Sequence, residues 1–327
     1  MNICTLHKNR GLIFFLALTG IIAAVILLTG TYSHLFAKTI EQKSFASPEE
    51  AVNALVNAVK ANDKEEMLAI LGPGSKELIS SGDEVADKTG REKFLKAYDE
   101  MNKLEKVSDT KAILHIGKDA WSLPIPIVEN NNKWVFDTKE GKEEILNRRI
   151  GRNELNVIDV VHAYVDAQHE YATEDCIGSG KVEFAQRFIS TKGKHNGLYW
   201  ETKEGEQESP LGPLVAQASK EGYASKEKGI TFAPYHGYYY KILKGQGKSA
   251  QGGAYNYVVK GKMILGFALV AYPAEYGNSG IMTFIVNQEG IIYQKNLGKN
   301  TKSIAEAIKN FDPDPTWKKV EETSKEG

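Results

Sequence analysis

The sequence predicts an α+β fold divided into two domains, and three observations carry this prediction. Segments with the apolar spacing of helices come before short segments rich in β-branched and aromatic residues, and this order occurs twice along the chain. Turns rich in glycine and asparagine separate the strand-like segments, which is typical of antiparallel sheets. The length of 327 residues also fits two domains of about 100–200 residues each.

The expected boundaries follow from changes in this pattern. We expect a leader, which is a signal peptide or a membrane anchor, then a short linker, two folded domains and a frayed tail. The respective ranges are residues 1–37, 38–44, 45–146, 147–317 and 318–327.

The first domain is expected to contain three helices followed by an antiparallel sheet. Ser47 followed by Pro48 is typical of a helix N-terminus, and two further helices are expected over residues 63–71 and 90–106. Three strands should follow, with a run of three asparagines as the turn between the last two. This order of elements resembles the cystatin-like and nuclear-transport-factor-like folds. The expected strands cover residues 111–117, 121–129 and 133–139.

The second domain is expected to open with a long helix. Asn153 is a good N-cap residue, and the residues after it place one apolar face along the helix, with a single glutamine as its polar member. Strands are then expected over residues 236–243 and 254–259, followed by a meander over residues 266–298. A helix over residues 301–314 should close the domain.

Five blocks of the sequence carry a family resemblance, namely residues 147–172, 197–200, 209–215, 234–243 and 266–298. In order along the chain, they resemble the secreted bacterial proteins of the domain-of-unknown-function 2950 family, whose label implies no activity. The long helix and the meander also resemble the globular head of type IV pilin-like proteins, in which a helix packs on an antiparallel sheet.

The N-terminus indicates export. Lys8 and Arg10 precede an uncharged apolar run from Gly11 to Leu28, which is long for a signal peptide and barely long enough to span a bilayer. Ala37 offers a small residue for cleavage. A cleaved signal peptide and an uncleaved membrane anchor both fit this pattern. Either one places the rest of the chain outside the cytoplasm, in the periplasm or cell envelope, because basic flanks stay on the cytoplasmic side.

The composition limits the partners. Lys and Arg total 41 and Asp and Glu total 42, so the net charge of −1 lacks the basic excess of a nucleic-acid-binding protein. We therefore expect no nucleic acid, and contact with a membrane only through the N-terminal apolar segment. Cys4 precedes the apolar run, which leaves Cys176 with no second cysteine for an internal disulfide and with an open role.

Three arginines form the first candidate site. Arg148, Arg149 and Arg152 cluster just before the expected N-terminus of the long helix. Helix N-termini attract negative groups and arginine adds a fork of donors, so an anion site is one interpretation. The other is that these arginines pair with the acids of residues 139–144.

An aromatic strand forms the second candidate site. His236 stands just before three consecutive tyrosines, and Tyr238 and Tyr240 share one face because strand side chains alternate. An aromatic face with a histidine could hold a sugar or a fragment of peptidoglycan. The alternative is that this face packs on the long helix.

The sequence gives weaker signals for metal binding and for nucleophilic catalysis. Asp159, His162, Asp166 and His169 form a stripe on the long helix that could ligate a metal, but a solvated helix face fits it equally. No metal-binding motif and no nucleophile motif is present. We therefore expect no metal and no cofactor.

These observations favour a non-catalytic envelope protein that binds another envelope protein or a cell-wall component. The alternative is an envelope-modifying hydrolase with a site between the two domains, near Arg148, Arg149, Arg152 and His236. If these residues gathered around one pocket with a nucleophile or a metal, the enzyme would be favoured.

Overall fold

The computed structural model describes residues 41–321, apart from 175–176, 179, 204 and 224–233. The chain divides into two units, Met1–Glu41 and Gln42–Gly327, and the fold below belongs to the second. The expected leader and Cys176 lie outside the described residues. Helices and antiparallel sheets together confirm the predicted α+β class. In the described part, no helix is both long and apolar enough to cross a bilayer.

The N-terminal half of this unit combines helices with one antiparallel sheet. The strands pair in the order β1-β2-β4-β5, and β3 pairs with β2. The helices are α2 (Pro48–Lys60), α3 (Lys64–Leu71), α4 (Lys76–Ile79) and α5 (Glu84–Glu100). The strands are β1 (Asn102–Ser108), β2 (Lys111–Ile116), β3 (Trp121–Ser122), β4 (Ile127–Asn130) and β5 (Lys133–Phe136).

Local sequence signals explain the starts of these elements. The Ser47 side chain accepts a hydrogen bond from the amide of Glu50 and caps α2, as predicted. Asn131 and Asn132 both have positive φ and form the predicted tight turn between β4 and β5. Asp83 caps α5, so this helix begins earlier than predicted.

The prediction for the end of this helix was wrong. α5 ends at Glu100, and the next residues form β1 instead of a further helical turn. Met101 already has an extended backbone, and β1 pairs antiparallel with β2. Pairing with a neighbouring strand therefore outweighs the helical spacing of this segment, as strand preference depends strongly on tertiary context.

Helix α6 (Thr138–Thr173) links the two halves of the unit. Asp137 caps it by accepting the amide of Glu140, so the prediction that this helix begins at Asn153 is wrong. Asn153 is buried inside α6, where its amide donates to the Ser279 carbonyl at 2.8 Å and is not needed as a cap. The predicted domain boundary after residue 146 falls within this unbroken helix, and the division into domains stays a prediction.

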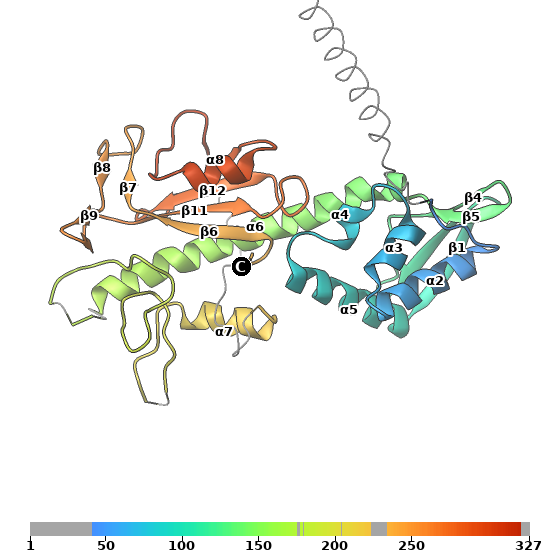
Figure 1. The fold of residues 1–327 in the computed structure, drawn as a ribbon, viewed down its shortest axis with the longest axis horizontal. Coiled ribbons are helices and arrows are strands. Elements are labelled where there is room, and N and C mark those ends of the chain that lie inside the picture. The colour runs from blue at the N-terminus through green and yellow to red at the C-terminus, as the bar shows by residue number, and fades with distance from the viewer. Residues whose placement is uncertain (1–40, 175–176, 179, 204, 224–233, 322–327) are drawn as a thin grey trace, which may run out of the picture. The chain divides into compact units, whose positions relative to one another are not determined.

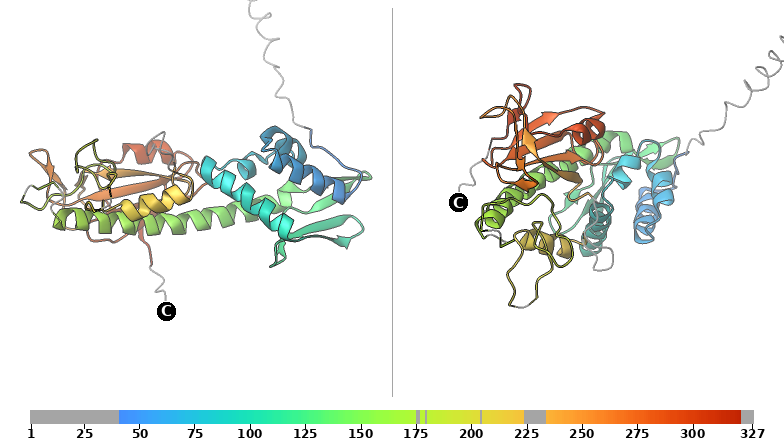
Figure 2. Two further views of the ribbon diagram at one scale, coloured as in Figure 1. Left: turned by 90° about the horizontal axis from the view of Figure 1, so that it is seen from below. Right: turned by 60° about the vertical axis from the view of Figure 1, so that its left-hand side comes forward.

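The C-terminal half adds a second antiparallel sheet with the order β14-β13-β12-β11-β6. Its strands are β6 (Tyr238–Leu243), β11 (Ala268–Pro273), β12 (Met282–Asn287), β13 (Tyr293–Asn296) and β14 (Lys318–Lys319). Figures 1 and 2 show these strands along the C-terminal part of α6, with the first helices gathered near its N-terminal part. The other elements are α7 (Gly212–Lys220), α8 (Thr301–Ala307), β7 (Gly245–Gln246), β8 (Tyr255–Asn256), β9 (Val258–Val259) and β10 (Lys262–Met263).

Strand β14 corrects the expected tail. Residues 318–327 were expected to be frayed, but Lys318 and Lys319 pair with β13. The amide of Val320 donates to the carbonyl of Ile292 at 2.9 Å, which continues the same edge. Lysines are typical of sheet edges because they discourage pairing with another chain.

Two clusters of buried apolar side chains stabilise the unit. One lies between α2, α3 and the first sheet, and the other between α6 and the second sheet. The predicted apolar face of α6 is confirmed, since Val161 and Tyr164 are each 1% exposed. Gln168, also buried, exchanges two hydrogen bonds of 2.8 Å with the backbone of Ala185, which satisfies its amide. The resemblance of this half to pilin heads stays a prediction.

Candidate functional site

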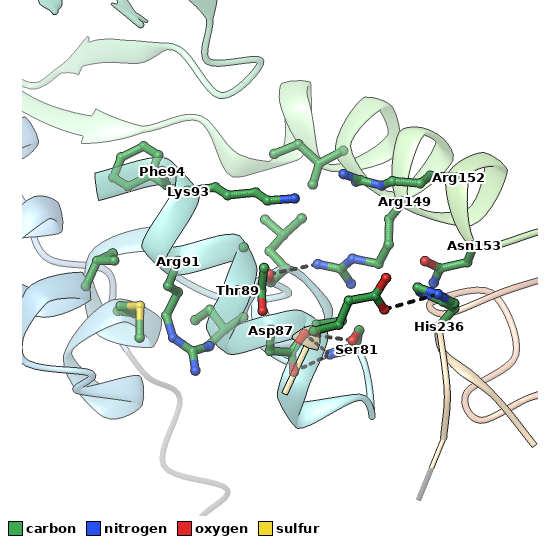
Figure 3. A pocket seen from close by; sticks show the side chains of 18 of the residues that line it. Ser81, Asp87, Thr89, Arg91, Lys93, Phe94, Arg149, Arg152, Asn153 and His236 are labelled. Atoms are coloured by element: carbon green, nitrogen blue, oxygen red, sulfur yellow. Dashed lines mark hydrogen bonds and ion pairs between the residues drawn. The ribbon is translucent and has the colours of Figure 1, made fainter. Parts of the chain in front are cut away.

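A cavity of about 590 Å³ lies between α5 and α6, and Figure 3 shows side chains that line it. The helices α2 and α3 and the segment before β4 supply apolar lining. The helices α6 and α7 and the turn before β6 supply polar groups, so both expected domains contribute. The volume falls within the range of about 300–1,000 Å³ that is usual for small-molecule sites.

Helix α5 borders this cavity, and only its second half packs against the N-terminal core, through the partly buried Phe94, Leu95, Ala97 and Tyr98. None of its 17 residues is buried, although a surface helix of this length usually buries an apolar stripe. Gly90 lines the cavity, and a Cβ added there would meet no atom within 4 Å. Phe94, one turn further along α5, lines the cavity and is only partly buried. Around Gly90, α5 therefore borders open space.

The floor of the cavity is aliphatic. Leu55 of α2, Met67 of α3, Ile79 of α4 and Ile125 before β4 all line it, and each is less than 9% exposed. These side chains belong to the hydrophobic cluster of the N-terminal half. The cavity is thus a continuation of that core toward α5.

Arg149 connects segments that are distant in the sequence. Its guanidinium donates to the carbonyls of Glu77 and Leu78 at 2.6 and 3.0 Å, and to the side-chain oxygen of Asn278 at 2.5 Å. Burial lowers the pKa of Arg149, and the negative charge of Asp87 opposes this shift. The arginine satisfies carbonyls near the C-terminal end of α4 and binds them to the C-terminal half.

His236 lies in a tight turn just before β6. Tyr235 and Tyr238 exchange two backbone hydrogen bonds, and the two residues between them, His236 and Gly237, have φ of 52° and 76°. Positive φ at both central positions is what a type I′ turn requires. Positive φ is uncommon for a residue other than glycine, and such strain often accompanies a functional position. The imidazole lines the cavity (Figure 3).

Two polar side chains face this imidazole. Its Nδ1 is 3.3 Å from the amide nitrogen of Asn156 on α6, and its Nε2 is 3.4 Å from Oε2 of Glu221. Burial lowers the pKa of His236, while the charges of Glu221, Asp83 and Asp159 oppose this shift. An amide nitrogen only donates, so Nδ1 accepts, and the neutral ring carries its proton on Nε2, toward Glu221.

The carboxylate of Asp83, a residue that is 2% exposed, holds the turn that contains His236. One carboxylate oxygen accepts the amide of Ala86 at 2.9 Å. The other accepts the hydroxyl of Tyr223 and the amide of Gly237, each at 2.8 Å. Burial and the charge of Asp83 raise the pKa of Tyr223, so its hydroxyl stays protonated and donates. Asp83 therefore joins the start of α5 to the turn that holds His236.

Cationic residues outnumber acidic residues in the lining of the cavity. Arg91 and Lys93 of α5 and Arg152 of α6 are among them, and their side chains have no hydrogen bond or ion pair to another described residue. In contrast, the carboxylate of Asp87 accepts bonds of 2.7 to 3.1 Å from the hydroxyl and amide of Ser81. The side-chain donors of these three cations are therefore free to bind a ligand, whereas the carboxylate of Asp87 already accepts hydrogen bonds from Ser81.

The structure brings three of the six predicted site residues to the cavity, namely Arg149, Arg152 and His236. Arg148 instead pairs with Glu144 at 2.6 Å, as the alternative interpretation expected, and its guanidinium carbon lies 6.0 Å from the ring centre of Trp121. The anion site at a helix N-terminus has lost its basis, because α6 begins well before these arginines.

The two predicted tyrosines lie away from the cavity lining. Tyr238 is fully buried and its hydroxyl donates to the carbonyl of Met282 at 3.0 Å. The hydroxyl of Tyr240 donates to the carbonyl of Tyr235 at 3.3 Å. Both tyrosines belong to or pack against the C-terminal core. Ligand contact by the six residues stays a prediction.

The aspartate and histidine stripe of α6 is mostly exposed. Asp159, Asp166 and His169 are exposed, and Nε2 of His169 lies 3.1 Å from the carbonyl of Gln288. Among the described residues, no three side chains of His, Cys, Asp or Glu come together as a metal-binding group.

Several contributors to the cavity were not predicted. Asp83 had a local signal, because an aspartate followed by an acidic residue and an apolar run is typical of a helix N-terminus. Gly90, Asn156, Glu221 and Tyr223 had none. Their roles depend on how α5, α6 and α7 meet, which no local pattern encodes.

The fold and the cavity define a class of α+β protein with two hydrophobic cores, one helix shared between them and a pocket beside that helix. The chain belongs to the family described as "Protein of unknown function (DUF2950)", whose model matches residues 42–320. This confirms the predicted family. Comparisons with curated proteins and with solved structures found no match. The family description gives no activity, so a function has to be argued from the cavity.

Proposed function

We propose that the protein is a non-catalytic binding protein of the bacterial cell envelope, and that the cavity between α5 and α6 holds its ligand. The observation that carries this proposal is that α5 buries no residue although it covers an aliphatic floor. Apolar surface that is not covered by other side chains gains stability when a ligand removes it from water. A ligand in the cavity would cover the aliphatic floor in this way.

A hydrolase at the same place has less support. General-base catalysis by His236 needs a hydroxyl, thiol or bound water within hydrogen-bonding reach. Among the described residues, the partners of its ring nitrogens are the amide of Asn156 and the carboxylate of Glu221. The hydroxyl of Ser81, which also lines the cavity, donates to Asp87. These contacts suit a fixed binding site better than an activated nucleophile.

The proposed location rests on the N-terminal sequence. Lys8 and Arg10 precede the uncharged run from Gly11 to Leu28, which is the pattern of an exported chain. An envelope protein or a cell-wall component remains the proposed partner for the folded unit.

Two glycines offer a matched test of the binding site. Gly90 and Gly151 both lie inside helices, have ordinary backbone angles and have room for a side chain, but only Gly90 is among the residues that line the cavity. Gly90→Leu fills part of the cavity, whereas Gly151→Leu should change helix propensity by the same amount, about 1 kcal/mol, and leave the cavity open.

Native mass spectrometry of the protein purified from its own envelope tests the proposal. We expect a bound small molecule in the wild type and in Gly151→Leu, and its loss in Gly90→Leu. The bound mass should stay constant on prolonged incubation, because the protein does not convert its ligand. Equal occupancy in both variants would show that the cavity is not the site, and conversion of the molecule would favour the hydrolase.

A further inference from the structure

The lining of the cavity limits the chemistry of its ligand, provided that the proposed function is correct. We propose that the ligand is an anionic amphiphile with a single hydrocarbon chain. The chain would lie on the aliphatic floor, and the anionic head would lie between Lys93 of α5 and Arg152 of α6.

The floor favours a chain over a polar ring. The lining residues Leu55, Leu71 and Ile125 have no polar side-chain atoms, so a buried hydroxyl group of a ligand would find no hydrogen-bond partner on them. A hydrocarbon chain avoids that cost and gains stabilisation in proportion to the apolar area it buries. Phe94 is the one aromatic residue at this end of the lining, which is little for a sugar site built on stacking.

The rim favours a negative head. Lys93 and Arg152 come from two different helices, and Figure 3 shows the Lys93 side chain extending toward the side of the cavity where Arg149 and Arg152 lie. Arg149 also contributes positive charge, although three of its donor contacts already go to protein oxygens. A carboxylate or phosphate would be drawn to this place by charge-assisted hydrogen bonds.

The positions of the acidic lining residues indicate at which side of the cavity the anionic head group binds. Asp87 is occupied by Ser81. Glu221 faces His236, and the neutral imidazole does not cancel its charge, so the His236 side of the cavity would repel an anion. The head is therefore assigned to the rim formed by Lys93 and Arg152, where no acidic side chain is bonded to either cation.

Isothermal titration of the full-length protein with octanoate, decanoate and dodecanoate, each below its micelle concentration, tests this assignment. Affinity should rise about fourfold for each added methylene until the floor is filled. Decanol, which has the same chain and no charge, should bind about tenfold more weakly than decanoate at low salt. Equal affinity for decanol and decanoate, or no dependence on chain length, would overturn the proposal.

Charge removal locates the head. The double variant Lys93→Gln and Arg152→Gln should lower the affinity for decanoate about tenfold and leave the affinity for decanol unchanged. Lys96→Gln is the matched control, since Lys96 is exposed on α5 but is not among the residues that line the cavity. An equal effect of the double variant on both probes would refute the assigned rim.

A vesicle flotation experiment identifies the source of the amphiphile. If the protein floats with phosphatidylcholine vesicles that contain lysophosphatidylglycerol, an anionic lipid with one acyl chain, and decanoate releases it, the ligand is taken from a bilayer. If it does not float but binds decanoate, the ligand is a soluble amphiphile. Either result supports the assigned chemistry.

The outcome also separates this proposal from the proposed function. A native ligand that Gly90→Leu removes, together with no binding of any alkyl carboxylate, would leave the binding function in place and refute the amphiphile. A polar saccharide as the bound mass would have the same meaning. Binding of decanoate that Gly90→Leu does not weaken would place the alkyl chain elsewhere and overturn the assignment.

Discussion

Asp83 offers the sharpest test of how the two halves are held together. Its carboxylate caps α5 and also accepts the hydroxyl of Tyr223 and the amide of Gly237, with 2% exposure. Loss of a cap costs about 1 kcal/mol, and loss of each buried hydrogen bond to a carboxylate costs about 1.5–3 kcal/mol. Asp83→Ala should therefore lower the free energy of unfolding by about 4 kcal/mol or more.

Two companion variants divide this loss. Asp63→Ala removes a comparable aspartate cap from α3, where the carboxylate accepts the amide of Glu66 in an exposed position, and should cost about 1 kcal/mol. Asp83→Asn keeps the cap, because asparagine is an equally good N-cap residue. Asp83→Asn replaces the second acceptor oxygen with a donor that faces the amide of Gly237. The free energy of unfolding that it loses should therefore lie between the losses of Asp63→Ala and Asp83→Ala.

Urea unfolding followed by tryptophan fluorescence measures all three variants. The reasoning would be refuted if Asp83→Ala cost no more than Asp63→Ala, because the bonds to Tyr223 and Gly237 would then contribute nothing. It would also be refuted if Asp83→Asn were as stable as the wild type.

Three further predictions concern other contacts, and the same urea assay measures each. Gly280→Ala would place a Cβ 2.0 Å from the hydroxyl of Tyr238, so we expect a loss of about 1–3 kcal/mol, and an unchanged midpoint would contradict this. Burial holds the pKa of His236 below its unfolded value of 6.5, so the folded state binds fewer protons there. The stabilisation from this group is fully present above pH 6.5 and is lost as the pH falls toward the lower folded pKa. His236→Asn should therefore reduce the slope of the free energy of unfolding against pH in this range. An equal slope in the wild type and the variant would contradict this prediction. Glu154→Ala removes an oxygen that accepts two amides at the start of β12, each at 2.9 Å, and should cost about 3 kcal/mol, whereas Glu170→Ala on the exposed side of α6 should cost little.

Much of the fold could be predicted from local sequence. Ser47 with Pro48, and the paired asparagines Asn131 and Asn132, signal a helix start and a tight turn through their own side chains and backbone preferences. The apolar face of α6 could be read for the same reason, since its spacing matches the helical repeat. These features depend on residues close together in the chain.

The errors lie where distant segments compete. Asn153 looked like a helix cap, but its amide finds the Ser279 carbonyl and α6 passes through it. The segment after Glu100 had helical spacing, but pairing with β2 made it a strand. Tyr238 looked like a surface residue of a binding face, yet it is fully buried.

The sequence by itself determined the α+β class, the family and the main helix and strand signals, because each depends on short-range spacing or on blocks read in order. It also supplied Arg149, Arg152 and His236 as residues of interest. Only the tertiary structure brought them to one cavity beneath α5, together with Gly90, which no pattern singled out. A cavity is the space that packing leaves between elements, so its position depends on all of those elements at once.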